Sequence, residues 1–195
     1  MKALCILIMI FLFSGCIINH NQRILISTVS GNIEAELYLD KAPVTAGNFL
    51  RYVDLGEYDT NACFYRVVRP DNQPDKKIKI EVIHGGFYTD SLVEKYQFPP
   101  IRHETTRETG ILHKDGVISM ARNAPGTASS EFFICIGDQP ELDYGGKRNP
   151  DGQGFAAFGK VTKGLEIVRK IQQMQDTNQY LLKPVKIKSI SRIID

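Results

Sequence analysis

Two apolar runs separated by a polar, turn-rich segment lie between Gly116 and Gly137, and this stretch constrains the fold more than any other. The first run is VISMA and the second is FFICI. The segment between them contains Asn-Ala-Pro-Gly and two serines, which do not continue a strand. We therefore expect two short strands that fold back on each other and present a loop and an aromatic strand on one surface.

Alternation of apolar and polar residues predicts further short strands on both sides of this pair. Residues 24–29 and 33–39 alternate in this way around a Gly31-Asn32 turn and indicate a hairpin. The remaining expected strands cover residues 61–69, 78–83, 155–161 and 185–194. About eight short antiparallel strands suggest closure into a barrel, which also removes exposed strand edges.

Helical spacing of apolar residues appears in two places. Residues 44–55 follow Pro43, which suits a first helical turn, and precede Gly56, which suits the position after a helix. Residues 164–173 form the second expected helix, whereas residues 87–111 show no clear period and indicate either loops alone or loops with a short turn of helix. The expected fold class is mainly β: a closed eight-stranded antiparallel β-barrel capped by two helices.

The N-terminus indicates a targeting segment rather than part of the fold. Lys2 precedes an apolar run over residues 3–13, which is too short for a bilayer span of ~20 residues. The small residues before Cys16 resemble the end of a bacterial lipoprotein signal, in which the cysteine thiol is lipidated. We expect a signal peptide over 1–15, a lipidated tether over 16–23 and one domain over 24–195. The expected location is periplasmic and membrane-anchored; a secreted soluble protein and an uncleaved anchor are the alternatives.

Composition narrows the range of partners. The net charge is +2, with 24% charged residues of both signs interspersed, so no basic stripe predicts nucleic-acid binding. Histidine and cysteine spacing fits no zinc site, so we expect no metal and no cofactor. His103 and His113 are expected to face solvent. Cys63 and Cys135 lie in strand patterns and act either as small core side chains or, in an oxidising compartment, as a disulfide.

Several short motifs, in order from Ile24 to the C-terminus, resemble those of the cyclophilins. They are APVTAGNFLRYVDLGEY, FYR, VIHGG and SMARNAPGTASSEFFI. The resemblance implies a peptidyl-prolyl cis/trans isomerase that acts on proline-containing polypeptides as a monomer, with contact to a membrane only through the N-terminal lipid. It also implies the barrel fold with a proline-led first helix.

Rotation about an X-Pro bond crosses a barrier of ~18–20 kcal/mol and needs neither nucleophile nor metal. It needs an apolar slot for the ring and a fixed cation beside the prolyl nitrogen. By resemblance, Arg66 is the catalytic cation and Phe133 is the floor of the proline pocket. Val82 and Leu142 match wall positions, and Phe155 falls near a position where many cyclophilins have histidine. Without the surrounding motifs, an ordinary arginine on an exposed strand face is the favoured interpretation of Arg66; with them, the catalytic cation is favoured.

Four residues depart from the cyclophilin pattern around the expected pocket. His84 and Glu131 replace glutamines, Arg122 replaces an asparagine that binds peptide, and Glu81 replaces a phenylalanine of the wall. We expect His84 to titrate near neutral pH and to bond the substrate backbone. We expect Glu131 to pair with Arg66 or with Arg122. These departures leave the fold assignment intact and bear on rate and peptide preference.

Three functions remain open on the sequence. The first is a peptidyl-prolyl isomerase that acts on exported proteins and assists their folding. The second is a chaperone module that binds proline peptides on the same fold with little turnover, which the four departures favour. The third is a lipid-tethered structural protein, which accounts for the N-terminus but for none of the pocket motifs.

Overall fold

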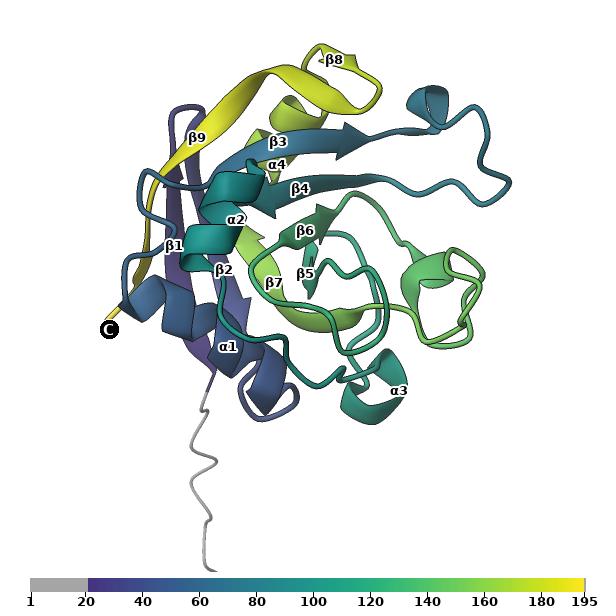
Figure 1. Ribbon diagram of the computed structural model, residues 1–195, viewed down its shortest axis with the longest axis horizontal. Helices are drawn as coiled ribbons and strands as arrows, with labels where there is room; N and C mark the ends of the chain where they lie inside the picture. Colours follow the sequence, from purple (N-terminus) through teal and green to yellow (C-terminus); the bar gives the residue numbers. More distant parts are fainter. Residues whose placement is uncertain (1–20, 195) are drawn as a thin grey trace, which may run out of the picture.

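The structure, a computed structural model, describes residues 21–194 and consists of one closed β-barrel with helices around it (Figure 1). Its strands are β1 (Gln22–Thr28), β2 (Gly31–Leu37), β3 (Cys63–Val68), β4 (Val82–Gly86), β5 (Val117–Met120), β6 (Phe132–Cys135), β7 (Ala156–Lys163), β8 (Asp176–Thr177) and β9 (Tyr180–Arg192). Eight of them form the ring β1-β2-β7-β5-β6-β4-β3-β9, which β1 and β9 close, and all pairings are antiparallel. The two-residue β8 pairs with β9 alone. The predicted fold class is confirmed.

The helices of residues 21–194 are α1 (Pro43–Asp54), α2 (Asp90–Tyr96), α3 (Thr106–Thr109) and α4 (Leu165–Gln172). The two expected helices, α1 and α4, lie at opposite ends of the barrel (Figure 1). The short α2 and α3 fall in residues 87–111, where we expected loops alone or loops with a short turn of helix. Thr89 and Thr105 each cap one of these helices through a side-chain oxygen. Over the part of the chain described here, no helix has the length and apolar character to cross a bilayer.

Several expected strand boundaries differ from the structure. The last strand begins at Tyr180 rather than at residue 185. The first hairpin turns at Val29 and Ser30, because Thr28 already pairs with Gly31. Residues 78–81 do not form a strand; β4 begins only at Val82. The side chain of Gln73 accepts from the Ile80 amide and donates to the Ile80 carbonyl, so a loop glutamine satisfies the backbone groups that a strand partner would take.

The first turn of α1 is capped by a residue far away in the sequence. Its N-cap residue, Ala42, offers no side-chain acceptor. The buried carboxylate of Glu104 instead accepts from the amides of Val44 (3.2 Å) and Thr45 (2.8 Å) and from the Thr45 hydroxyl (2.7 Å). A negative charge is favourable at a helix N-terminus, where backbone N–H groups are unpaired. Glu104 thereby fixes the segment before α3 against α1.

Apolar side chains pack on both faces of the barrel wall. Inside, Phe132 contacts Phe49 of α1, with ring centroids 5.2 Å apart, and belongs to the main core. Outside, its neighbour Phe133 belongs to a second, smaller cluster. The two phenylalanines therefore point to opposite faces of the sheet, as adjacent residues of a regular strand do. The outer cluster is the apolar surface on which the candidate site is built.

The two strand cysteines are core side chains. Cys63 and Cys135 are both buried and both free thiols, so they form no disulfide. Burial raises the pKa of Cys63 to about 12, which leaves its thiol protonated and unreactive at neutral pH. Of the two interpretations that the sequence left open, the structure supports the small core hydrophobe.

Candidate active site

One cross-strand row on the outer face of the barrel brings the predicted catalytic and pocket residues together. Arg66 of β3 pairs with His84 of β4, and His84 pairs with Phe133 of β6. Directly opposed residues in an antiparallel sheet project to the same face with their side chains in contact range. The rings of His84 and Phe133 stack with centroids 5.6 Å apart. Arg66 therefore lies two strands away from the phenylalanine, on the same surface.

The four predicted pocket-wall and floor residues meet around this row. Val82, Phe133 and Leu142 are buried members of the outer cluster, and the half-buried Phe155 packs against it. The ring of Phe155 meets that of Phe133 edge-on, with centroids 5.3 Å apart. These four residues come from separate strands and loops and form one continuous apolar cluster. Such a surface suits a small saturated ring.

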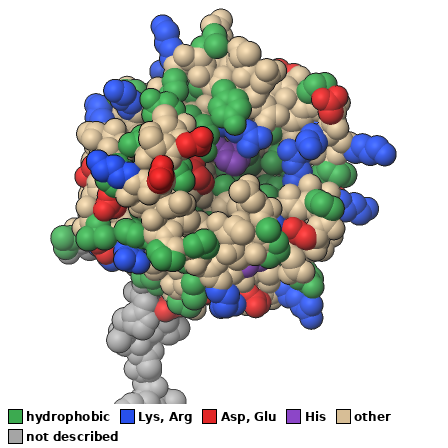
Figure 2. Space-filling view, in the orientation of Figure 1, with side chains coloured by type: hydrophobic (Ala, Val, Ile, Leu, Met, Phe, Trp, Pro, Cys, Tyr) green, Lys and Arg blue, Asp and Glu red, His purple; other side chains and the backbone are tan. Residues whose placement is uncertain are grey.

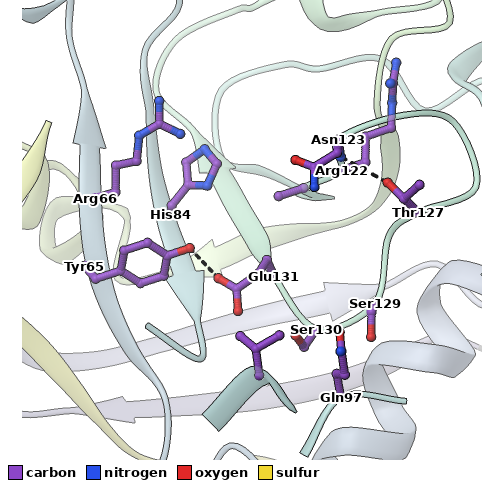
Figure 3. Close-up of a pocket in the computed structure, with 12 residues that line it drawn as sticks. Tyr65, Arg66, His84, Gln97, Arg122, Asn123, Thr127, Ser129, Ser130 and Glu131 are labelled. Atoms are coloured by element: carbon purple, nitrogen blue, oxygen red, sulfur yellow. Dashed lines mark hydrogen bonds between the residues drawn. The ribbon is translucent and has the colours of Figure 1, made fainter. Parts of the chain in front are cut away.

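A polar cavity of about 310 Å³ adjoins the row. Figure 2 shows a hollow in this face with a histidine at its base, basic side chains on one side and acidic ones on the other. The cavity is lined by Tyr65, Arg66, His84, Val93, Gln97, Ala121, Arg122, Asn123, Thr127, Ser129, Ser130 and Glu131. In Figure 3, Arg66 and His84 lie side by side on neighbouring strands, and Tyr65 points across to Glu131.

An irregularity in β3 explains why both Tyr65 and Arg66 face this cavity. Adjacent residues of a regular strand point to opposite faces. The pairing of β3 with β4 and with β9 shifts register between Phe64 and Arg66, which places Tyr65 in a β-bulge. Sequence reasoning missed Tyr65 because alternation cannot reveal a bulge. It also missed Val93 and Gln97, which come from the segment that has no clear period.

The expected ion pairs of Glu131 are not formed. Its carboxylate accepts a hydrogen bond from the Tyr65 hydroxyl, and its Oε1 atom is buried without a hydrogen-bond partner. Arg66 instead donates to the side chain of Gln179. Burial raises the pKa of Glu131 to about 7, although the Tyr65 hydrogen bond opposes that shift. Glu131, rather than His84, is the pocket group that titrates near neutral pH.

Arg122 holds a loop instead of presenting a free guanidinium to peptide. It donates to both carboxylate oxygens of Asp151, at 2.8 Å each, and to the carbonyl of Gly154. Its side chain is only 1% exposed, and its guanidinium lies over the ring of Phe155, 5.1 Å from the centroid. The expectation that Arg122 substitutes for a peptide-binding asparagine is therefore not supported by this geometry. The residue fixes Phe155 and the loop before it.

Two further departures from the cyclophilin pattern also differ from expectation. Burial, with the positive charges of Arg66 and Arg148 adding to it, lowers the pKa of His84 to about 3. His84 is therefore neutral at physiological pH, and the expectation that it titrates there is wrong. Glu81 faces away from the pocket, since its carboxylate accepts from Gln172 of α4.

His113 is buried, which contradicts the expectation that it faces solvent. Its Nδ1 atom lies 2.7 Å from Asp143, and its Nε2 atom lies 3.0 Å from the Ser119 hydroxyl. This order of residues resembles a hydrolytic triad, but Ser119 is 0% exposed and cannot reach a substrate. The imidazole stacks on Phe133 with centroids 5.9 Å apart, so it supports the pocket floor from the side opposite His84. His103 is half-buried and lies 3.2 Å from the carbonyl of Gln153.

Within residues 21–194, no cluster of three or more histidine, cysteine, aspartate or glutamate side chains is arranged to hold a metal ion. The chemistry available at the row is that of a fixed guanidinium beside an apolar surface. A guanidinium stays protonated and offers directed N–H donors, so it can stabilise a developing lone pair on a nearby nitrogen.

Sequence comparisons identify relatives over almost the whole described domain. A family model described as "Cyclophilin type peptidyl-prolyl cis-trans isomerase/CLD" matches residues 23–192. Peptidyl-prolyl cis-trans isomerase A of Dickeya dadantii (strain 3937) is 36% identical over 159 residues, covering 81% of this chain and 75% of the relative. A peptidyl-prolyl cis-trans isomerase of Acinetobacter baylyi is 34% identical over 177 residues, covering 87% of this chain and 85% of the relative.

Structural comparison gives the same fold. A crystal structure of a cyclophilin-type isomerase from Cryptosporidium parvum superimposes with a TM-score of 0.71 at 22% identity, covering 90% of this chain and 99% of that one. A second crystal structure of that protein, in the presence of the dipeptide Ala-Pro, matches with a TM-score of 0.70. At this level of identity the likeness concerns the fold alone.

Proposed function

The chain belongs to the cyclophilin-type peptidyl-prolyl cis-trans isomerases, and from that premise we propose that it accelerates rotation about X-Pro bonds in exported polypeptides and so assists their folding. The observation that carries the proposal for this chain is the cross-strand row from Arg66 through His84 to Phe133. The row sets a guanidinium beside the apolar cluster. No other chemistry is required to rotate a tertiary amide.

The proposed mechanism is electrostatic. A proline ring rests on the outer cluster, with Phe133 beneath it and Leu142 and Phe155 beside it. Arg66 donates to the prolyl nitrogen as the amide twists, which localises the nitrogen lone pair and weakens conjugation across the C–N bond. The Arg66 donor is already in position, and the site is partly shielded from solvent. Its hydrogen bond to the prolyl nitrogen is therefore stronger in the twisted state than in either planar ground state.

The test is the relaxation of a proline tetrapeptide from cis to trans in the presence of the full chain. We expect first-order acceleration that is proportional to protein concentration, and titration of the same peptide should give saturable binding. Binding without acceleration would contradict the proposed enzyme and would identify a peptide-binding module.

The module is the second candidate, and one observation favours it. Phe133, Val82 and Leu142 are 2% exposed or less, so the ring must enter beside Phe155 at the half-buried margin of the cluster. If entry of the ring limits turnover, the site holds a proline peptide without accelerating its rotation. The relaxation experiment separates the two candidates, since a module binds the peptide but leaves its relaxation rate unchanged.

We also propose that the enzyme acts as a monomer, because the row and the outer cluster of one chain already supply the guanidinium and the apolar contacts that the proposed mechanism needs. A light-scattering mass near twice that of one chain would contradict this part of the proposal.

The proposed location is the periplasmic face of a membrane, with a lipid on the thiol of Cys16. The support is the sequence alone, because residues 1–20 lie outside the described part of the structure. Replacing Cys16 with serine is expected to move the protein from the membrane fraction to the soluble fraction. Cys5→Ser is the matched control, since that cysteine lies within the signal that is removed. Membrane association that persists in Cys16→Ser would exclude the lipid anchor.

A further inference from the structure

The guanidinium of Arg66 is held by a residue from the far end of the chain. Its Nε and Nη2 atoms both donate to the side-chain oxygen of Gln179, at 3.1 Å and 2.5 Å. Gln179 belongs to the turn between β8 and β9, which packs beside β3 (Figure 1). Two donors on one acceptor fix both the position and the plane of the guanidinium, which a single hydrogen bond would leave free to rotate.

Gln179 is itself fixed on three sides. Its Nε2 atom donates to the carbonyl of Asn72 (2.9 Å), and its backbone N–H donates to Asp176 (2.9 Å). Its carbonyl accepts from the amide of Val67 (2.8 Å), the residue after Arg66. Asn178 and Gln179 both have positive φ, 51° and 75°, which non-glycine residues adopt only where the surroundings enforce it. The turn therefore fixes the position of the Gln179 side-chain amide.

The hairpin is locked to β3 by a second arginine. Arg69 pairs with Asp176, whose side chain is only 5% exposed, and also donates to the carbonyl of Gln172 at the end of α4. Asn72 adds a hydrogen bond of 3.1 Å to the same aspartate. Arg69 thus holds the hairpin against the barrel, and the hairpin in turn holds Arg66.

The chemistry of the acceptor matters as much as its position. A carboxylate could accept the same two hydrogen bonds from the guanidinium but would neutralise part of its charge. An amide oxygen accepts them and leaves the full positive charge in place. Within residues 21–194, the Arg66 side chain donates hydrogen bonds through Nε and Nη2. Its Nη1 atom therefore remains available to a substrate. The guanidinium of Arg66 is therefore both fixed in orientation and fully charged.

We propose that Gln179 is the positioning residue for the catalytic arginine: it orients Arg66 toward the prolyl nitrogen without neutralising it. This inference rests on the proposed function of Arg66. It extends the site to the β8–β9 turn, which contributes no atom to the apolar surface that receives the ring.

The test is Gln179→Met in the full chain. Methionine keeps the unbranched shape of glutamine and leaves the backbone conformation unchanged, but it removes the acceptor for Arg66 together with the Nε2 donor to Asn72. We expect kcat for the tetrapeptide to fall by about tenfold, because the guanidinium loses its fixed orientation, while peptide affinity changes less than twofold. Gln175→Met is the matched control: it makes the same change at an exposed side chain next to the same hairpin and should retain wild-type kcat.

An independent readout follows Arg66 directly. In the 15N–1H spectrum of arginine side chains, the Nε–H signal of Arg66, assigned by its loss in Arg66→Ala, should exchange slowly with water in the wild type. It should exchange fast in Gln179→Met and remain slow in Gln175→Met. Wild-type kcat in Gln179→Met would overturn the proposal. A parallel fall of kcat, peptide affinity and melting temperature would also overturn it, because that pattern marks a purely structural role. If the wild type itself does not accelerate relaxation, the proposed function fails, and the exchange measurement still decides whether Gln179 holds Arg66.

Discussion

Arg66→Ala is expected to lower kcat/KM for cis-to-trans relaxation by about 10²–10³-fold, the usual loss when one preorganised donor is removed from a charge-stabilising site. The outer apolar cluster stays intact in this variant, because Arg66 is not among its members. Peptide binding should therefore fall much less than kcat. The measurement is the relaxation rate at several enzyme concentrations, combined with a binding titration of the same peptide.

Two variants make the result specific. Arg102→Ala removes a guanidinium that is 60% exposed and pairs with Glu104 and Glu108. Arg102 does not line the cavity, so this variant should retain wild-type kcat. Arg66→Lys keeps a positive charge but loses the planar fork that Gln179 grips, so its rate should lie between those of the wild type and Arg66→Ala. An Arg66→Ala protein that accelerates relaxation as well as the wild type would end the assignment of this residue as the catalytic cation.

The parts of the fold that local patterns encode could be predicted from the sequence. Alternation in residues 24–39 and the two apolar runs around residues 117–136 place strands that the structure contains, since burial of one sheet face imposes a period of two. The parts that depend on distant side chains could not. The Gln73 side chain displaces a strand start at residues 78–81, and Glu104 caps a helix that lies about 60 residues away. Neither effect leaves a local pattern.

The residues of the candidate site also fall into those that local motifs predict and those that depend on distant side chains. Arg66, Phe133 and Val82 are predictable because each lies in a short strand motif, and the barrel brings those strands together. Leu142 lies in a 3₁₀ turn after β6, and only the resemblance to the cyclophilins points to it. The hydrogen-bond partners of these residues could not be predicted, because they are set by the packing of loops that are distant in the sequence. The partner of Arg66 is Gln179, a residue of the last hairpin that no motif singled out.

The same limit applies to charge. His84 was expected to titrate near neutral pH from its ordinary pKa, but its burial beside Arg66 and Arg148 could not be read from the sequence. The buried histidine that supports Phe133 was missed for the same reason: only the folded chain shows that His113 lies between Asp143 and Ser119.

Glu131→Gln is expected to stabilise the protein at pH 8 by about 3 kcal/mol, with little effect at pH 4, because each unit of pKa difference corresponds to about 1.4 kcal/mol. Burial raises the pKa of Glu131 from 4.5 in the unfolded chain to about 7 in the folded one. Below pH 4.5 both states carry the proton and the carboxyl costs nothing. Between pH 4.5 and pH 7, only the folded state keeps the proton on Glu131. The free energy of unfolding therefore falls as pH rises through this range and levels off above pH 7. Glutamine has no such proton and still accepts from Tyr65.

The measurement is the free energy of unfolding by urea from pH 4 to pH 8 for both proteins. The difference between them isolates Glu131, whereas the wild-type curve alone does not. His84 acts with the opposite sign: since its folded pKa is about 3, the unfolded state binds its proton first, and stability rises with pH up to about 6.5. His84→Asn should therefore leave the Glu131 effect in place. A constant difference between the wild type and Glu131→Gln across this range would mean that the pKa of Glu131 is the same in the folded and the unfolded chain, which would contradict the prediction.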